Sequence, residues 1–438
     1  MSTYGSYKDS EIEWIGDIPS HWERLPLKYF GEVTLGKMLT KEDKGGYHLK
    51  PYLRSQNIQI EKVDISDVKQ MWFSESELIK LRLFNGDLLF NEGGDVGRTS
   101  IWNDELEECY IQNSVNRVRF KKDNPLYYLF LSVLYHSVGH YDSVVNRVSI
   151  PHLTKEKLES VVFLRPPLPE QQQIVSFLDT KTSLIDSLIE KTQRKIGLLK
   201  EQRTSLINQV VTKGLNPDVE MKDSGVEWIG EIPSHWVTSK LGLYTLKIGS
   251  GSTPRGGSEV YVDQGVPFIR SQNVHFRGLI LDDISFIDEE THNSMKGSKV
   301  YFGDVLLNIT GGSIGRCCVV YEVEEMNVNQ HVSIIRTKEK LKNSFLNYIL
   351  NSDVGQSQVI YNISGGNREG LTIEGISDFR ITLPPLEEQN QIVEYLDKET
   401  HLIDKTISNE EKRIELLKEY RQSLISEVVT GKVKVSGV

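Results

Sequence analysis

The chain has 438 residues, enough for two or three domains that each have a separate core. Hydrophobic residues make up 38% and charged residues 26%, a balance typical of soluble globular proteins, and no apolar run approaches the roughly 20 residues that cross a bilayer. The formal net charge of −10 argues against a uniformly basic nucleic-acid-binding protein. The polar N-terminus lacks a secretory signal, and Cys109, Cys317 and Cys318 match no zinc spacing. We therefore expect a cytoplasmic protein without a metal site or a disulfide framework.

A leader, residues 1–22, opens the chain and ends in the motif EWIGDIPSHW. His21 stands between Ser and Trp there, and we interpret it as structural. A first module follows in residues 23–165. Its apolar segments Asp87–Phe90 and Val115–Phe120 are bounded by Gly, Asn and Asp, as strands are, and Pro125–Ser137 has helical character. The sequence therefore predicts a mixed, β-rich module.

Residues 166–215 form a helical region that begins with Pro166-Pro167. From Glu170 to Thr212 apolar residues recur at heptad spacing, which predicts one side of a coiled-coil seam. About 43 residues at about 1.5 Å each make a rod of around 65 Å. The principal seam residues are Leu178, Ile185, Ile189, Ile196, Leu199 and Leu206.

The same plan then recurs, which makes the chain a tandem duplication. Residues 216–236 are a linker and a second leader, EWIGEIPSHW; residues 237–383 are a second module, with strand-like Val305–Leu307 and Val332–Ile335 and helical Ser344–Asn351. Residues 384–433 are a second helical region, and 27 of 47 positions between Pro384 and Thr430 match the first copy at an offset of 218. Its seam residues are Leu396, Ile403, Ile407, Ile414, Leu417 and Leu424.

The expected fold is α+β, with two β-rich modules that are each followed by a long helix. Two equivalent amphipathic rods are buried most economically against each other, so we expect an antiparallel coiled coil with pseudo-twofold symmetry. Identity is dense in the helices and leaders and sparse inside the modules. The modules are also near neutral, with 20 basic and 20 acidic residues in 20–165 and 14 and 16 in 235–383. Most of the excess acid therefore lies in the helices and flanking segments.

Polar motifs suited to DNA contact recur in both modules. Arg can bind guanine through two hydrogen bonds, and Gln or Asn can bind adenine in the same way. A motif that is identical in both copies can equally contact phosphate or brace the module, and we favour bracing. The candidate residues of this motif are Arg54, Gln56 and Asn57 in the first copy and Arg270, Gln272 and Asn273 in the second.

Two glycine-rich turns, Gly93–Arg98 and Gly311–Arg316, offer backbone N–H groups and an arginine to phosphate. Arg98 and Arg316 are the candidate residues, and the alternative is a tight hairpin with a surface arginine. Specific readout should lie where the copies differ. The candidates there are Asn146, Arg147, Asn367 and Arg368, together with the segments Lys37–Lys44 and Ser252–Arg255; any of these can be a solvated loop.

The sequence resembles the specificity subunit of type I restriction-modification systems over essentially its whole length. The marks are the EWIG-x-IPSHW leader, the PPL-x-EQ-x-QIV-x-x-LD helix start and the LLKE-x-R-x-SLI-x-x-VVT helix end, each present twice. The resemblance implies two target recognition domains that each read half of a split DNA sequence, and helices that set the spacing. It also implies a non-catalytic chain that docks two methyltransferase subunits and, in the full complex, restriction and translocation subunits. S-adenosylmethionine, ATP and Mg are then expected only in those partners.

Two alternatives remain open at this point. A stand-alone DNA methyltransferase would need a cofactor-binding glycine motif and an Asn-Pro-Pro-Tyr/Phe motif. The chain shows neither; Asn124-Pro125-Leu126-Tyr127 lacks the second proline and is better interpreted as a turn into a helix. A coiled-coil scaffold whose modules bind protein or carbohydrate would show no sequence-preferring DNA binding. No catalytic residues are expected in this chain.

Overall fold

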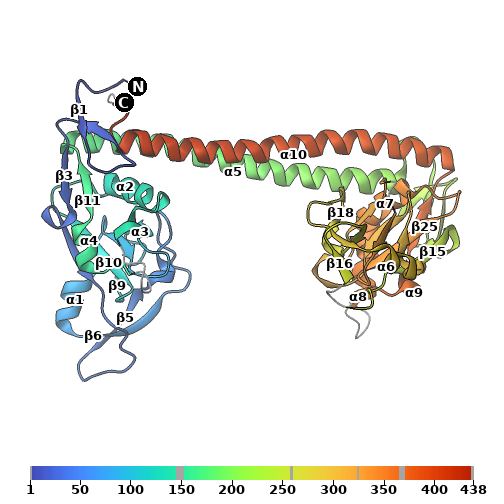
Figure 1. The fold of residues 1–438 in the computed structure, drawn as a ribbon, viewed down its shortest axis with the longest axis horizontal. Helices are drawn as coiled ribbons and strands as arrows, with labels where there is room; N and C mark the ends of the chain where they lie inside the picture. Colours follow the sequence, from blue (N-terminus) through green and yellow to red (C-terminus); the bar gives the residue numbers. More distant parts are fainter. Residues whose placement is uncertain (1, 145–151, 257–259, 323–324, 365–369, 436–438) are drawn as a thin grey trace. The chain divides into compact units, whose positions relative to one another are not determined.

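The structure is a computed structural model, and it describes residues 2–144, 152–256, 260–322, 325–364 and 370–435. The chain divides into two compact units. Unit 1 comprises Met1–Thr192 and Lys412–Val438, and unit 2 comprises Gln193–Glu411. The boundaries between the units cut through the two long helices (Figure 1). Each unit therefore combines one β-rich module with half of each helix.

Two short antiparallel ribbons begin unit 1. Strand β1 (Tyr7–Asp9) pairs with β2 (Asp17–Pro19), and β3 (Glu23–Pro26) pairs with β11 (Val162–Arg165). The second ribbon joins the start of the module to its end, so the module closes on itself just before the proline pair that precedes the long helix.

The leader holds the first turn of the following helix in each unit. Trp22 is fully buried and donates from Nε1 to Glu170 Oε2 at 2.7 Å, while His21 Nε2 lies 2.8 Å from Glu170 Oε1. In unit 2, Glu388 makes the same two contacts with Trp236 and His235, both at 2.7 Å. The structural interpretation of the leader histidines is confirmed.

Two sheets form the body of unit 1. The first is antiparallel, in the order β4-β10-β7-β8, and the second has the order β6-β5-β9 with β5 and β9 parallel. All four residues of β7 are buried. Leu88 and Phe90 face the helices and Leu89 faces the second sheet, so the first three residues form a continuous apolar run before Asn91. The strands are β4 (Gly31–Leu35), β5 (His48–Leu53), β6 (Lys69–Phe73), β7 (Leu88–Asn91), β8 (Thr99–Ile101), β9 (Tyr110–Ile111) and β10 (Val115–Phe120).

The described part of the first module also contains the short α-helices α1 (Glu75–Leu81), α2 (Pro125–Ser137), α3 (His140–Val144) and α4 (Lys155–Ser160). Helix α2 begins as the sequence predicts. Asn124 Oδ1 accepts a hydrogen bond from the Leu126 N–H at 3.0 Å, and Pro125 occupies the first turn. Asn124-Pro125 is therefore a helix cap.

Unit 2 repeats this plan. Its four-stranded sheet has the equivalent order β15-β25-β22-β23, and β17 and β24 are parallel as β5 and β9 are. The second sheet differs: β20 pairs with β17 as β6 does with β5, and β16 and β21 are additional strands that make the sheet five-stranded. The strands are β12 (Met221–Asp223), β13 (Glu231–Pro233), β14 (Val237–Lys240), β15 (Thr245–Ser250), β16 (Tyr261–Val262), β17 (Val266–Ile269), β18 (Val274–His275), β19 (Gly278–Leu279), β20 (Ser285–Ile287), β21 (Lys299–Val300), β22 (Val305–Asn308), β23 (Cys317–Val319), β24 (Met326–Val328), β25 (Val332–Thr337) and β26 (Arg380–Leu383); the helices are α6 (Glu289–Ser294), α7 (Asn343–Asn351), α8 (Asp353–Ser364) and α9 (Ile373–Ser377).

The predicted long helices are α5 (Leu168–Lys213) and α10 (Leu386–Val429). In unit 2, Lys195 Nζ lies 2.6 Å from Glu410 Oε1, and Arg203 Nε donates to Asp404 Oδ1 at 3.1 Å. Moving forward along α5 thus moves backward along α10, which confirms the antiparallel pairing. No helix among the described residues has the length and apolar character needed to cross a membrane.

The predicted seam is buried unevenly. Eight of its residues are buried: Leu178, Ile185, Ile196, Leu396, Ile403, Ile407, Ile414 and Leu424. Four are half-buried: Ile189, Leu199, Leu206 and Leu417. The seam also contains polar residues near its middle, Thr192 of α5 and Glu410 of α10. Thr192 is buried and donates from Oγ1 to the Leu188 carbonyl at 2.7 Å, and Glu410 is the partner of Lys195.

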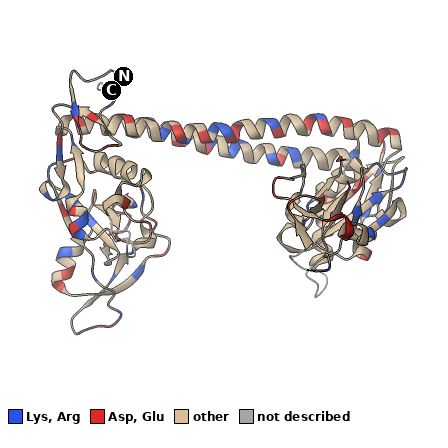
Figure 2. Cartoon of the chain, viewed as in Figure 1, with Lys and Arg blue, Asp and Glu red and all other residues tan. Residues whose placement is uncertain are grey.

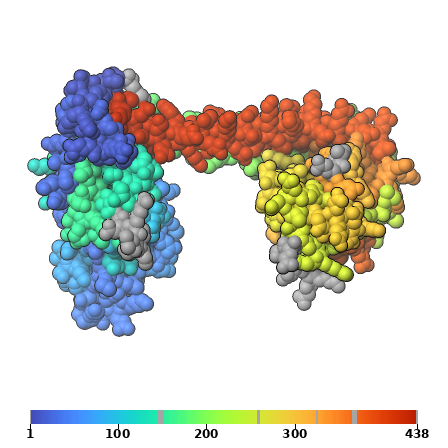
Figure 3. Space-filling model, viewed as in Figure 1, coloured from blue at the N-terminus to red at the C-terminus, as the bar shows by residue number. Residues whose placement is uncertain are grey.

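The C-terminal end of each helix leaves the heptad pattern and enters a module. Ile425, Val428 and Val429 of α10 belong to the core of unit 1, where the Tyr127 hydroxyl donates to the Val429 carbonyl at 3.0 Å. Figure 3 shows the red end of α10 against the blue N-terminal residues of that unit. Because an α-helix has 3.6 rather than 3.5 residues per turn, its apolar face turns away from the seam as it proceeds. The end of α10 therefore completes the core of the first module.

Candidate nucleic-acid interface

The repeated Arg-Ser-Gln-Asn motif forms a tight turn after β5 and after β17. Asn57 is 3% exposed; its Oδ1 accepts from the Arg54 N–H at 3.1 Å, and its Nδ2 donates to the Asp64 carbonyl at 2.9 Å. Asn273 is 2% exposed and makes the equivalent bonds to the Arg270 N–H and the Ile280 carbonyl. Because both ends of each amide are used inside the protein, the geometry favours bracing over base contact for these two residues.

The other side chains of this turn have different environments. Arg54 donates from Nη2 to Asp67 Oδ2 at 2.6 Å, and Arg270 is half-buried. Gln56 is exposed, and Gln272 is exposed with a single 3.1 Å bond to Asp283. The two glutamines are therefore the members of the motif best placed to contact a ligand.

The glycine-rich turns are hairpins, because β7 pairs with β8 and β22 with β23 on either side of them. Gly97 has a φ of +78°, and a Cβ there would lie 2.2 Å from the Tyr141 ring. Arg98 is not a free surface arginine: its Nη2 donates to the Ser55 carbonyl at 3.1 Å. In unit 2 the Asn308 amide donates to the Ser271 carbonyl at 2.8 Å, and Arg316 is half-buried with no side-chain hydrogen bond among the described residues. The structure thus brings the two repeated motifs together.

A third turn, which the sequence analysis missed, joins them. Gln112–Ser114 lies between β9 and β10, and Ser114 Oγ accepts from the Ser55 N–H at 3.0 Å. The equivalent turn in unit 2 is Asn329–His331, where the Asn329 N–H donates to the Ile269 carbonyl at 3.0 Å. The turns occupy the same place in the fold and carry different polar residues. A comparison of the two copies at these turns could therefore have identified them as candidate contact residues.

In each unit a further segment lies at this same end of the four-stranded sheet. The Asn113 N–H donates to the Lys37 carbonyl at 2.9 Å, and Thr253 donates to Gln330 Oε1 at 2.6 Å. The segment that precedes α4 is also adjacent, since the Leu153 N–H donates to the Glu92 carbonyl at 2.6 Å. The remaining candidates, Asn146, Arg147, Asn367 and Arg368, lie outside the described residues.

We call this end of each sheet the reading rim. Rim 1 consists of Lys37–Thr40, Ser55–Asn57, Glu92–Arg98 and Gln112–Ser114, and rim 2 of Ser252–Arg255, Ser271–Asn273, Ile309–Arg316 and Asn329–His331. Glu92 of rim 1 corresponds to Ile309 of rim 2. Burial raises the pKa of Glu92; His152 lowers it in part, and Glu156 raises it further.

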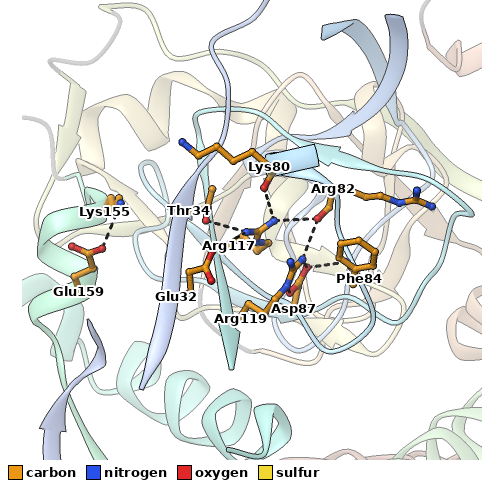
Figure 4. Close-up of polar contacts among 10 residues, drawn as sticks. All are labelled: Glu32, Thr34, Lys80, Arg82, Phe84, Asp87, Arg117, Arg119, Lys155 and Glu159. Carbon is orange, nitrogen blue, oxygen red and sulfur yellow. Dashed lines mark hydrogen bonds and ion pairs between the residues drawn. The ribbon is translucent and has the colours of Figure 1, made fainter. Parts of the chain in front are cut away.

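The opposite end of the same sheet in unit 1 carries two arginines of β10 (Figure 4). Arg119 donates from Nε and Nη2 to Asp87 at 2.7 and 2.6 Å, and Arg117 donates to the carbonyls of Lys80 and Arg82. Burial and the neighbouring Arg119 lower the pKa of the Arg117 guanidinium. Arg336 and Asp304 make the equivalent pair in unit 2, both bonds at 2.7 Å. These arginines brace the modules.

Basic side chains that project into solvent are found beside them. Exposed Lys28, Lys121 and Lys122 line an open groove of about 630 Å³ in unit 1. Acidic and basic residues instead alternate along α5 and α10 (Figure 2). A chain with net negative charge therefore still presents local positive charge on its first module.

The thiols of the chain are buried, and potential metal ligands are not clustered in the described part of the chain. Cys109, Cys317 and Cys318 are buried, and burial raises the pKa of the Cys109 and Cys318 thiols to about 12. Among the described residues no cluster of three His, Cys, Asp or Glu side chains could hold a metal ion. The rims offer exposed amides and hydroxyls and, in rim 2, the half-buried imidazole of His331, which are groups that bind and discriminate.

The model of the type I restriction modification DNA specificity domain matches residues 19–198 and 233–419. The chain belongs to this family. Its members are DNA-recognition components that are not themselves catalytic, and neither the scaffold nor the stand-alone methyltransferase alternative finds support. The chain is 27% identical to the putative type I restriction enzyme MjaX specificity subunit of Methanocaldococcus jannaschii, over 98% of this chain and 97% of that protein. It is 26% identical to the EcoBI specificity subunit of Escherichia coli, over 79% and 73%.

Solved structures show the same fold. A chain from a type I R-M system, described in a study of complex assembly and conformational transition, matches with a TM-score of 0.73 at 16% identity, over 95% of this chain and 99% of that one. The HsdS subunit from Thermoanaerobacter tengcongensis matches with a TM-score of 0.55 at 17% identity, over 99% and 100%.

Proposed function

We propose that each reading rim of this specificity subunit reads one half of an asymmetric, bipartite double-stranded DNA target. The observation that carries this proposal is that the two rims share a backbone frame and differ in the side chains it presents. Two identical rims would favour a palindrome, whereas two different rims favour two unrelated half-sites.

Direct readout needs donors and acceptors that can reach base edges. Rim 1 offers Gln56 and the Gln112–Ser114 turn; rim 2 offers Gln272, Gln330 and His331. A glutamine can bind adenine through two hydrogen bonds, and each such contact discriminates by about 1–3 kcal/mol.

We further propose that the length of the helix pair sets the distance between the half-sites. Seven residues inserted into both α5 and α10, between Leu184 and Leu199 and between Leu402 and Leu417, keep the heptad register and add about 10 Å. The nonspecific spacer of the target should then grow by about 3 base pairs, at 3.4 Å per pair, while both half-sites stay the same. An unchanged spacer would exclude this role.

The partners that we propose are two methyltransferase subunits, joined in the full complex by restriction and translocation subunits, in the cytoplasm. S-adenosylmethionine, ATP and Mg would belong to those partners. In each unit one leucine of α5 and one of α10 are more than half exposed: Leu184 and Leu416 in unit 1, Leu198 and Leu402 in unit 2. Repeated apolar surface fits two copies of one partner. Leu184→Lys should remove one bound methyltransferase and Leu402→Lys the other, measured as the mass of the complex; retention of both in each variant would exclude this surface.

The experiment that tests the main proposal is mapping of methylated sites in DNA treated with the reconstituted complex. We expect two different half-sites at a fixed separation. A palindromic target, or methylation without sequence preference, would contradict the proposal.

A further inference from the structure

A short hairpin follows the Arg-Ser-Gln-Asn turn in each unit. In unit 1 it is closed by the Ile58–Val63 bridge, and in unit 2 by the pairing of Val274 with Leu279. Glu61 and Arg277 occupy the same position in the two hairpins, three residues after Ile58 and Val274. Equivalent positions therefore carry opposite charges.

In unit 1 the hairpin carboxylate binds the helix pair. Arg421 of α10 donates from Nη1 and Nη2 to the two carboxylate oxygens of Glu61 at 2.8 and 2.6 Å, and from Nε to Asp186 of α5 at 3.0 Å. The Arg421 side chain is only 19% exposed. Burial lowers the pKa of this guanidinium, but Glu61 and Asp186 together outweigh burial and raise it. Arg421 thus lies between two carboxylates.

In unit 2 the polarity is reversed. Asp404 of α10 accepts from Arg203 Nε of α5 at 3.1 Å and lies 3.2 Å from Nη2 of Arg277 in the hairpin. Arg203 and Asp404 are the repeat equivalents of Arg421 and Asp186, at the offset of 218. The helices therefore offer one arginine and one aspartate in both units, and the hairpin binds whichever has the opposite charge.

We propose that this Arg–Asp pair is a latch that seats each module on the helices, and that it accepts a hairpin residue of either charge. The latch residues are positioning residues: they fix the orientation of the reading rim, because the braced Asn57 or Asn273 turn leads directly into the hairpin. Glu61 has a φ of +69°, an uncommon conformation for a residue other than glycine, which fits a side chain held by its partner. The role in DNA reading rests on the proposed function; the latch itself does not.

The test compares one helix substitution in two backgrounds. Asp186→Asn in the otherwise unchanged chain leaves Arg421 paired with Glu61. In a Glu61→Arg chain, which reproduces the charges of unit 2, the same substitution leaves two arginines without a carboxylate. Measured by hydrogen exchange at residues 58–63 in the full chain, Asp186→Asn should change protection less than about threefold in the first background and at least about tenfold in the second.

Unit 2 provides the mirror experiment. Arg203→Gln is compared in the unchanged chain and in an Arg277→Glu chain, and hydrogen exchange is measured at residues 274–279. Glu107→Arg, with the same change of charge on an exposed residue of the first module, is the control and should leave hairpin exchange unchanged. An equal effect of Asp186→Asn in both backgrounds would overturn the proposal, as would full opening by Glu61→Arg alone.

A second measurement separates positioning from mere attachment. In the Glu61→Arg, Asp186→Asn double variant, the preference for the correct half-site 1 over a singly changed half-site 1 should fall about tenfold. The corresponding preference at half-site 2 should stay constant. Loss at both half-sites overturns the positioning role. If neither the parent chain nor any variant shows sequence-preferring DNA binding, the proposed function fails. The hydrogen-exchange data would still test whether the latch exists.

Discussion

Units 1 and 2 are most alike where the leader meets the helix and least alike at the reading rims. The buried indole of Trp22 and that of Trp236 each donate to a glutamate at 2.7 Å, and the four-stranded sheets have equivalent orders. The rims instead present Gln112–Ser114 in one unit and Asn329–His331 in the other. The fold thus contains two kinds of position: at some a substitution lowers stability, and at others a substitution alters only the surface.

The physical reason is burial. A buried donor that loses its partner costs about 1–3 kcal/mol, whereas an exposed amide exchanges protein contacts for water at little cost. Buried residues, including Asn57 and Asn273 within the rims, are therefore constrained in both copies, and the exposed rim residues are free to diverge.

The largest expected effect lies in this shared frame. Trp22→Ala and Trp236→Ala each remove a fully buried indole and its bond to the helix, so each should lower the free energy of unfolding by about 4 kcal/mol. Denaturant unfolding of both variants provides the measurement. Costs that differ between the two by more than about 2 kcal/mol would contradict the equivalence of the frames.

The repeated turn gives the next largest effect. Asn57→Ala leaves the Arg54 N–H and the Asp64 carbonyl without their partner and should cost about 2 kcal/mol, with increased hydrogen exchange at residues 54–64. Gln56→Ala, at the exposed neighbour, should change stability by less than about 0.5 kcal/mol. If Asn57→Ala keeps full stability and loses DNA affinity, Asn57 is a base contact and the bracing interpretation is wrong.

The rims should show effects confined to one half-site. Gln112→Ala should reduce discrimination at one position of half-site 1 by about 1–2 kcal/mol, and Gln330→Ala should do the same in half-site 2. Binding to a panel of singly substituted targets measures both. A loss spread evenly over both half-sites would show that these glutamines do not read bases.

The smallest expected effect is a pH dependence of stability at Glu92, which is absent at its equivalent, Ile309. Because the folded state holds the Glu92 proton more tightly than the unfolded chain does, stability should fall as the pH rises from the ordinary glutamate pKa through the raised pKa in the folded protein. Glu92→Gln should abolish that fall. Hydrogen exchange of residues 92–98 across this pH range tests it, with residues 309–315 of the same chain as the internal control; a fall of the same size in the variant would contradict the assignment to Glu92.

The sequence predicted the elements better than their contacts. Heptad spacing predicted α5 and α10, because periodicity is a local property. Their antiparallel pairing was predicted from the duplication, because two equivalent amphipathic rods are buried most economically against each other. It did not predict that Val428 and Val429 would enter the core of the first module, because that depends on how the apolar face turns relative to the module. The Arg-Ser-Gln-Asn motif was visible, but its division into a buried Asn57 and an exposed Gln56 was not. The Gln112–Ser114 turn was missed because nothing local distinguishes it from a solvated turn.

The central claim, one reading rim per half-site, is tested most directly by exchanging a single module. Residues 20–165 would be replaced by the corresponding segment of another specificity subunit, and the methylated sites of the reconstituted complex would be mapped beside those of the parent. We predict that one half-site changes completely while the other half-site and the spacer stay the same. A change in both half-sites would contradict the claim.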